Sequence, residues 1–134
     1  MCIFCKIAVG EIPSYKVYED DVCLAFLDLS QSNLGHTLVI PKKHYSNILE
    51  VDEQTAGYLF NIVTKLTKAI SKSLNYSNFN ILNNCGEEAG QTVHHFHIHI
   101  IPRKADDKIN IELTSNNLEK DKFIELANKI KESI

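Results

Sequence analysis

Several features that would define a class of protein are absent from this chain of 134 residues. No apolar run approaches the roughly 18 residues that a membrane-spanning helix needs. The N-terminus has no basic segment followed by an apolar stretch, so we expect no secretory signal and a cytoplasmic protein. The net charge of −3 argues against a nucleic-acid binder that works by neutralising phosphates.

Internal repeats, low-complexity tracts and linkers are absent as well. The hydrophobic content of 44% and the charged content of 23% are ordinary for a globular protein. We therefore expect a single domain over residues 1–134, with a core at about 2–104 and a C-terminal extension at about 105–134. Four cysteines in such a chain fit free thiols or metal ligands better than disulfides.

The chain does contain a concentration of histidine: four of its six histidines lie between positions 94 and 99. From position 95 onward histidine alternates with apolar residues, and this period of two predicts a half-buried strand. Pro102 is expected to end the strand, because proline has no backbone N–H to give to a ladder. One face should carry the imidazoles of His95, His97 and His99, and the core face should carry Phe96, Ile98 and Ile100.

Three imidazoles on one face are costly to crowd unless they hold a metal, hold an anion or carry out a reaction. A metal ion needs ring nitrogens at about 2.0–2.1 Å, whereas residues four apart on a straight strand are roughly 13 Å apart. A phosphate can be met by neighbours two apart, and a nucleophilic site uses one imidazole to attack and another to bind charge. The spacing therefore favours phosphate chemistry over a three-histidine metal site.

Cys2 and Cys5 form a Cys-x-x-Cys pair at the N-terminus. The two thiols could be incidental, could form a redox pair or could be half of a zinc site. A redox pair is disfavoured because no strand precedes it, as one would in a thioredoxin-like βαβ unit. A zinc half-site is the preferred interpretation, and it needs two further ligands.

Polar candidates also lie at the ends of other predicted elements. Asp28 follows the strand expected at 22–27 and could be a turn residue or an acceptor for a ligand's hydroxyl groups. His36 immediately precedes the strand expected at 37–40. Gly86 and Gly90 lie in the loop 83–92, where they would permit tight turns and a close approach of backbone N–H groups to an anion, although an ordinary hairpin loop would also contain them.

The remaining periodicity predicts an α+β fold: an antiparallel sheet of about five strands with one long central helix and a C-terminal helix. Asp52 and Asn117 are the expected N-caps of the two longer helices, and Asn75 is the expected left-handed residue that ends the central one. The tail beyond the core could pack on its own domain or on a second subunit. Strands are expected at 15–19, 22–27, 37–40, 78–82 and the histidine run, a loop with a short strand at 103–117, and helices at 2–8, 51–74 and 118–134.

The run from His95 to Ile101 resembles the histidine triad motif, His-φ-His-φ-His-φ-φ, in which φ is an apolar residue. The resemblance runs in order from residue 2 to about 104 and identifies the chain as similar to the histidine triad (HIT) family. Within that family it is similar to the cysteine-bearing, zinc-binding type of histidine triad nucleotide-binding protein. The other segments that carry it are residues 2–7 (CIFCKI), 11–13 (EIP), 25–28 (AFLD), 35–44 (GHTLVIPKKH) and 90–93 (GQTV).

The resemblance implies a HIT-like fold and a purine nucleotide-binding hydrolase that cleaves nucleoside 5′-phosphoramidates or related nucleotidyl conjugates. His97 would attack the α-phosphorus and form a nucleotidyl-histidine, which water then hydrolyses. His99 would donate to phosphoryl oxygens, and His36 would support the same pocket. The implied catalytic residues are His36, His95, His97 and His99; the implied nucleotide-binding residues are Phe26, Asp28, Leu29, Asn84, Gly90, Gln91, Thr92, His97 and His99.

The same resemblance implies a structural zinc ion on Cys2, Cys5, His44 and His95, and a homodimer whose strands join into one continuous sheet. The expected partners are an AMP or GMP moiety and a second copy of the chain, with neither nucleic acid nor membrane. Three alternatives stay open: a dinucleoside polyphosphate hydrolase of the same superfamily, a nucleotide-binding regulatory protein with little turnover, and a zinc-stabilised interaction module with a vestigial triad. The intact loop 83–92 and Asp28 argue against the last.

Overall fold

A computed structural model describes all 134 residues and contains one five-stranded antiparallel sheet with three α-helices. The strand order is β1-β2-β3-β5-β4, so β1 and β4 form the two edges. This architecture confirms the predicted α+β class. The elements are α1 (Ile3–Ala8), β1 (Lys16–Glu19), β2 (Cys23–Leu27), β3 (Thr37–Pro41), α2 (Glu53–Leu74), β4 (Asn78–Leu82), a 3₁₀ turn η1 (Glu87–Ala89), β5 (Ile98–Arg103) and α3 (Lys120–Glu132).

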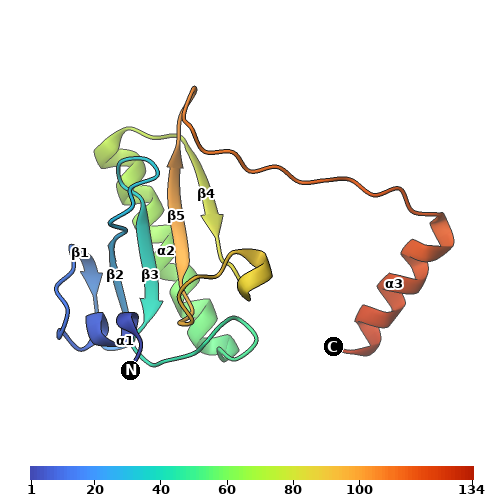
Figure 1. The fold of residues 1–134 in the computed structure, drawn as a ribbon, viewed down its shortest axis with the longest axis horizontal. Coiled ribbons are helices and arrows are strands. Elements are labelled where there is room, and N and C mark those ends of the chain that lie inside the picture. The colour runs from blue at the N-terminus through green and yellow to red at the C-terminus, as the bar shows by residue number, and fades with distance from the viewer.

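The two faces of the sheet are covered by different helices (Figure 1). The long helix α2 covers one face, where Leu59, Ile62 and Val63 pack against buried side chains of β2, β3 and β5. The short helix α1 covers part of the other face, where Phe4 and Ile7 pack against side chains of β2 and β3. The second face is thus left partly open beside α1.

The central helix has the predicted ends. Asp52 is the N-cap, and its carboxylate accepts a hydrogen bond of 2.8 Å from the backbone N–H of Thr55, which would otherwise lack an intrahelical acceptor. The helix ends at Asn75, which adopts the left-handed conformation with φ 61° and ψ 48°. Both predictions are confirmed.

The histidine strand keeps its predicted alternation but begins later than predicted. Phe96, Ile98 and Ile100 are fully buried against α2, which confirms that they form the core face. Regular pairing starts only at Ile98, opposite Val39 of β3. Before that point the chain is held by another segment, because the backbone N–H of Phe96 donates to the carbonyl of Tyr45 at 2.7 Å.

The prediction that Pro102 ends the strand is wrong, since β5 continues to Arg103 and Pro102 lies opposite Phe79 of β4. The carbonyl of Pro102 accepts a hydrogen bond of 2.8 Å from the side chain of Asn33, which lies in the loop before β3. Because the N and C=O of one strand residue point to the same side, the missing N–H faces this loop and not β4. The ladder to β4 therefore loses no bond.

The C-terminal segment leaves the body of the molecule altogether (Figure 1). Residues 104–119 form no helix or strand, so the short strand predicted within 103–117 is wrong. The helix α3 starts at Lys120 with Glu119 at the capping position, so Asn117 is not its cap. Every side chain from position 111 to 134 is exposed. No helix of the structure combines the length and the apolar character that a membrane span requires.

Candidate active site and metal cluster

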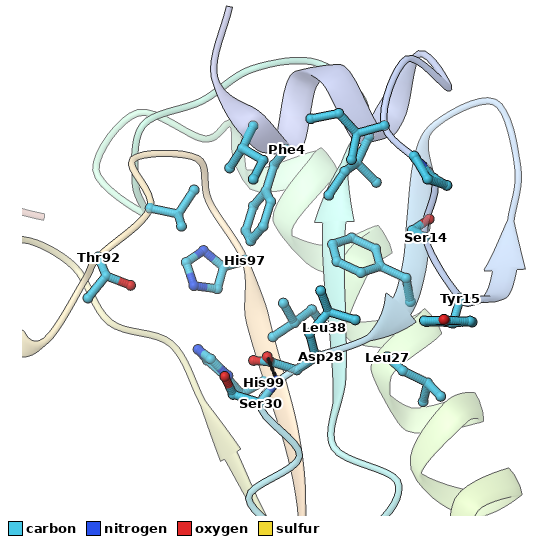
Figure 2. Close-up of a pocket in the computed structure, with 17 residues that line it drawn as sticks. Phe4, Ser14, Tyr15, Leu27, Asp28, Ser30, Leu38, Thr92, His97 and His99 are labelled. Atoms are coloured by element: carbon cyan, nitrogen blue, oxygen red, sulfur yellow. Dashed lines mark hydrogen bonds between the residues drawn. The ribbon is translucent and has the colours of Figure 1, made fainter.

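A pocket of about 430 Å³ lies on the open side of the sheet, beside α1 (Figure 2). Its walls come from α1, from the segment before β1, from the end of β2 and from the start of β5. Most of its lining is apolar, including Phe4, Phe26 and Leu38. The polar groups that converge on it are Asp28, Ser30, Thr92, His97 and His99.

His97 is buried and points into this pocket from the residue just before β5. Its Nδ1 lies 2.7 Å from the backbone carbonyl oxygen of His95. A carbonyl can only accept, so Nδ1 carries the proton and the unprotonated Nε2 keeps its lone pair. Burial lowers the pKa of His97, which keeps the ring neutral near pH 7. His97 therefore has the tautomer and charge of a nucleophile.

A pair of hydrogen-bonded imidazoles, from His36 and His99, lies beside His97. The Nε2 of His36 is 2.9 Å from the Nδ1 of His99, and the rings of His97 and His99 are 5.0 Å apart between centroids. The Nδ1 of His36 donates to the carbonyl of Ser30 at 3.2 Å, so in the neutral pair His99 Nδ1 donates to His36 Nε2. Burial, together with nearby His97 and His36, lowers the pKa of His99 to about 4.

Asp28 adds a negative charge at the edge of this histidine group. One carboxylate oxygen lies 3.6 Å from His36 Nε2, and the other accepts a hydrogen bond of 2.8 Å from the backbone N–H of Ser30. The negative charge of this carboxylate favours the protonated form of His99 and so partly opposes the effect of burial on its pKa. In that form His99 can present an N–H to an anion in the pocket.

The first triad histidine has a different environment. His95 is fully buried, and its Nδ1 does not line the pocket but meets the two thiols of the Cys-x-x-Cys pair and the Nδ1 of His44. The six distances among these four ligand atoms are 3.3 Å (Cys2–Cys5), 3.6 Å (Cys2–His44), 3.4 Å (Cys2–His95), 3.3 Å (Cys5–His44), 3.5 Å (Cys5–His95) and 3.2 Å (His44–His95).

These distances are those of a small tetrahedron. Zinc bonds of about 2.0–2.3 Å at tetrahedral angles place ligand atoms roughly 3.3–3.8 Å apart. The Nε2–H of His95 donates to the carbonyl of Pro41 at 2.8 Å, which leaves the Nδ1 lone pair directed into the cluster. Two thiols and two imidazoles are also the donor set that zinc favours in structural sites. The four residues therefore fit a closed zinc site that ties α1 to the segment after β3 and to the approach to β5.

The structure brings most of the expected nucleotide-binding residues to the pocket, but not all. Phe26, Asp28, Leu29 and Thr92 line it, with the Leu29 side chain 84% exposed at its rim. Asn84, Gly90 and Gln91 do not line it.

Gln91 holds the loop together from within. Its Oε1 accepts from the Gly86 N–H at 2.8 Å, and its Nε2 donates to the carbonyls of Ser46 and Val93. Its polar atoms are therefore engaged inside the protein.

Phe4 is a pocket residue that was not anticipated from the sequence. Its ring contacts those of Phe26, His95 and His97 edge to face, with centroids 5.6, 6.0 and 5.2 Å away. The signal that could have found it is its position between Cys2 and Cys5. If those thiols and His95 bind the same metal ion, the side chains between the two cysteines must lie close to the triad.

Comparison with known proteins identifies the family of the chain. Residues 9–106 match the family described as HIT domain. The Bacillus subtilis "Protein hit" is 55% identical over 102 residues, which cover 76% of this chain and 70% of that protein. The adenosine 5′-monophosphoramidase hnt1 of Schizosaccharomyces pombe is 42% identical over 106 residues, which cover 79% of this chain and 77% of that protein. The chain belongs to the HIT domain family.

Solved structures share the fold. A HIT family protein from Bacillus anthracis superposes with a TM-score of 0.95 at 46% identity, covering 99% of this chain and 96% of that one. A histidine triad nucleotide-binding protein from Candida albicans gives 0.90 at 34% identity, with 99% and 96% covered. A zinc-bound histidine triad family protein from Mycobacterium smegmatis gives 0.78 at 32% identity, with 98% and 96% covered.

Proposed function

We propose that this protein hydrolyses purine nucleoside 5′-phosphoramidates or related nucleotidyl conjugates through a covalent nucleotidyl-His97 intermediate. The observation that carries the proposal is the hydrogen bond of 2.7 Å from His97 Nδ1 to the His95 carbonyl, which leaves a neutral Nε2 lone pair in an apolar pocket. A relative that is an adenosine 5′-monophosphoramidase supports the choice of substrate class.

The reaction has two balanced steps. His97 Nε2 attacks the α-phosphorus, a P–N bond forms to the imidazole, and the P–N bond to the leaving group breaks. The departing amine needs one proton, which the protonated His36–His99 pair supplies through His99. Water then attacks the phosphorus, His97 leaves, and the proton released from water returns to the pair, giving a nucleoside 5′-monophosphate.

The charge of the substrate assists the first step. A phosphate in the pocket favours the cationic form of His99, which burial otherwise keeps neutral. The protonated pair then stabilises negative charge on the phosphoryl oxygens, as an oxyanion site does. Proton donation is therefore coupled to the presence of substrate.

The remaining pocket residues would hold the nucleoside. The purine base would lie between Phe26, Leu38 and Leu29, which offer an apolar slot. Asp28 would accept from the ribose hydroxyls, since a carboxylate has acceptor capacity beyond its bond to the Ser30 N–H.

Zinc on Cys2, Cys5, His44 and His95 would be structural. When bound, the ion would neutralise two thiolates and cross-link three segments that are far apart in the sequence. The four ligands complete the coordination shell, so no reacting atom has a place on the metal. The zinc-bound M. smegmatis relative supports zinc as the ion.

We also propose a homodimer formed through β4. This strand is an unpaired edge of the sheet and would expose backbone N–H and C=O groups in a lone chain. Pairing of β4 with β4 of a second copy would give one continuous sheet and remove that edge.

The test of the chemistry is a turnover panel with purified protein. Adenosine phosphoramidate, guanosine phosphoramidate and diadenosine polyphosphates would be compared at equal concentration by product chromatography. We expect the phosphoramidates to be hydrolysed fastest, and a difference between the first two would assign the base. Preference for the dinucleotides would indicate the dinucleoside polyphosphate hydrolase instead. Tight nucleotide binding without turnover would indicate the regulatory alternative.

A further inference from the structure

The loop between β2 and β3, residues 28–36, carries polar groups of the site at both of its ends. Asp28 follows β2 and His36 precedes β3, and the backbone N–H of Asp28 donates to the carbonyl of His36 at 3.0 Å. Ser30 lies between them: its N–H meets the Asp28 carboxylate at 2.8 Å, and its carbonyl accepts from His36 Nδ1 at 3.2 Å. The directions of the carboxylate and of the imidazole therefore depend on the shape of one loop.

The side chain of Gln31 lies inside this loop and braces it. Its Nε2 donates to the carbonyls of Asp28 at 2.5 Å and of His36 at 2.7 Å, and its Oε1 accepts from the backbone N–H of Gly35 at 2.8 Å. A side-chain amide offers two N–H groups and one carbonyl oxygen, so every group of the amide is engaged. Gln31 thus ties the two ends of the loop together from within.

Two of these backbone groups have no other hydrogen-bond partner. The Asp28 carbonyl accepts only from Gln31, and the Gly35 N–H donates only to Gln31. Gly35 has a φ of 103°, and a Cβ there would lie 2.7 Å from the Leu74 side chain, so the chain is packed closely against the end of α2 at this point. Loss of the amide would leave both groups unpaired unless the loop changed its shape.

We propose that Gln31 is a positioning residue, which sets the directions of the Asp28 carboxylate and the His36 imidazole without touching the substrate. Gln31 does not line the pocket, whereas Asp28 and His99 do, close to each other at the pocket wall (Figure 2). The His36 ring is hydrogen-bonded to His99 over 2.9 Å, so its orientation is passed on to the imidazole that faces the phosphate. Precise placement matters for catalysis, because a misplacement of about 1 Å can cost roughly 100-fold in rate.

This inference rests on the function proposed above and adds a residue on which that site depends. The alternative is a brace that serves only the stability of the β2–β3 hairpin. A brace of that kind would lower Tm when removed, but the folded protein would keep its histidine geometry and its kcat. A positioning residue would alter both.

Two substitutions remove the brace in different ways. Gln31→Glu keeps the shape and an acceptor for the Gly35 N–H but has no donor for the two carbonyls, and Gln31→Met keeps a similar length without strong hydrogen-bonding groups. Gln54→Glu makes the same chemical change at an exposed position in the first turn of α2 and is the matched control.

NMR of ¹⁵N-histidine-labelled protein without substrate measures the imidazoles directly, because a protonated ring nitrogen is distinguished from an unprotonated one. We expect both Gln31 variants to shift the ring nitrogens of His36 and His99 and to leave those of the exposed His94 unchanged. Gln54→Glu should give the wild-type spectrum.

Steady-state kinetics well below Tm completes the test. We expect kcat for adenosine phosphoramidate to fall about tenfold in both Gln31 variants, since His99 is no longer held in line, and to keep its wild-type value in Gln54→Glu. A lower Tm with wild-type His36 and His99 signals and a wild-type kcat would overturn the proposal. An inactive wild type would refute the proposed function, whereas unchanged His36 and His99 signals would refute the role of Gln31, so the two failures are distinguishable.

Discussion

His95 and His97 are two residues apart, and both are buried, yet they have opposite arrangements. His95 donates from Nε2 to the Pro41 carbonyl and presents Nδ1 to two thiols and an imidazole. His97 donates from Nδ1 to the His95 carbonyl and presents Nε2 to an open apolar pocket. One ring therefore completes a set of four side chains that could hold a metal ion, while the other leaves a free lone pair facing the pocket.

The difference lies in which nitrogen of each ring is fixed by the backbone and in what surrounds the other nitrogen. In both rings a backbone carbonyl fixes the tautomer, and the choice of nitrogen decides what the other nitrogen meets. Burial lowers the pKa of both residues and keeps them neutral, as ligation and nucleophilic attack each require. The two residues differ in the groups that surround them. His95 is surrounded by two thiols, whereas His97 is next to Phe4, His99 and the open pocket.

The largest expected effect is the loss of activity when His97, the histidine that faces the pocket, is replaced. His97→Ala should lower kcat by several orders of magnitude, because the covalent step loses its nucleophile, while nucleotide affinity stays within a few-fold. Single-turnover kinetics and equilibrium binding would measure the two quantities. The control is His94→Ala, which removes an exposed imidazole from the same segment and should leave both unchanged. A near-normal kcat in His97→Ala would exclude the covalent mechanism.

Much of this comparison could be anticipated from local pattern. The alternation after His95 predicted which side chains face the core, and the structure buries Phe96, Ile98 and Ile100 as expected. Cys2, Cys5, His44 and His95 were grouped through the resemblance to a family, and the structure brings them together, although their zinc stays a prediction. Short-range periodicity and motif spacing are properties of neighbours along the chain, so the sequence carries them.

What could not be anticipated depends on distant partners. Pro102 continues its strand because Asn33, 69 residues earlier, meets its carbonyl. Gln91 has its amide engaged by the carbonyls of Ser46 and Val93, a fact that no local pattern records. The destination of α3 was open because an amphipathic helix indicates that it is buried, but not against which molecule.

A smaller effect is expected at the ribose end of the pocket. Asp28→Asn should weaken binding of ribonucleotides more than of analogues that lack the ribose hydroxyls, since each charge-assisted bond contributes about 1.5–3 kcal/mol. That corresponds to roughly 10- to 100-fold in affinity, which calorimetry can resolve. The asparagine oxygen can still accept from the Ser30 N–H, so the turn is retained.

Asp21→Asn, in an exposed turn, is the matched control for this substitution. It should change neither the affinity for ribonucleotides nor the affinity for analogues that lack the ribose hydroxyls. Equal losses for ribose and hydroxyl-free ligands in Asp28→Asn would assign the carboxylate to the turn alone.

Removing a cluster ligand should affect stability and zinc together, and activity only secondarily. Cys5→Ser should reduce zinc below one equivalent per chain and lower Tm, because the ion no longer ties α1 to the histidine segment. The fall in kcat should be far smaller than in His97→Ala. Cys85→Ser, which removes a thiol outside the cluster, should retain full zinc and the wild-type Tm.

Metal analysis of protein purified without chelators or a nickel column decides whether the cluster holds zinc. Less than about a tenth of an equivalent in the wild type, with Cys2 and Cys5 both freely alkylated in the folded state, would rule the site out.

The smallest effect is expected at Phe4, the residue that lies between the two histidines. Its ring contacts His95, His97 and Phe26, while its helix is held by the cysteines on either side. Phe4→Leu keeps an apolar side chain but removes the edge-to-face contacts, worth about 0.5–1.5 kcal/mol per pair. We therefore expect KM for the nucleotide to rise a few-fold and kcat to change little, because the tautomer of His97 depends on the His95 carbonyl and not on this ring. Zinc content should stay at the wild-type value. Ile7→Val, on the same helix and pocket wall, is the control and should give a smaller change in KM. A loss of zinc in Phe4→Leu would mean that the cluster and the pocket are packed as one unit. The environments of His95 and His97 would then differ in their chemical groups but would not be structurally independent.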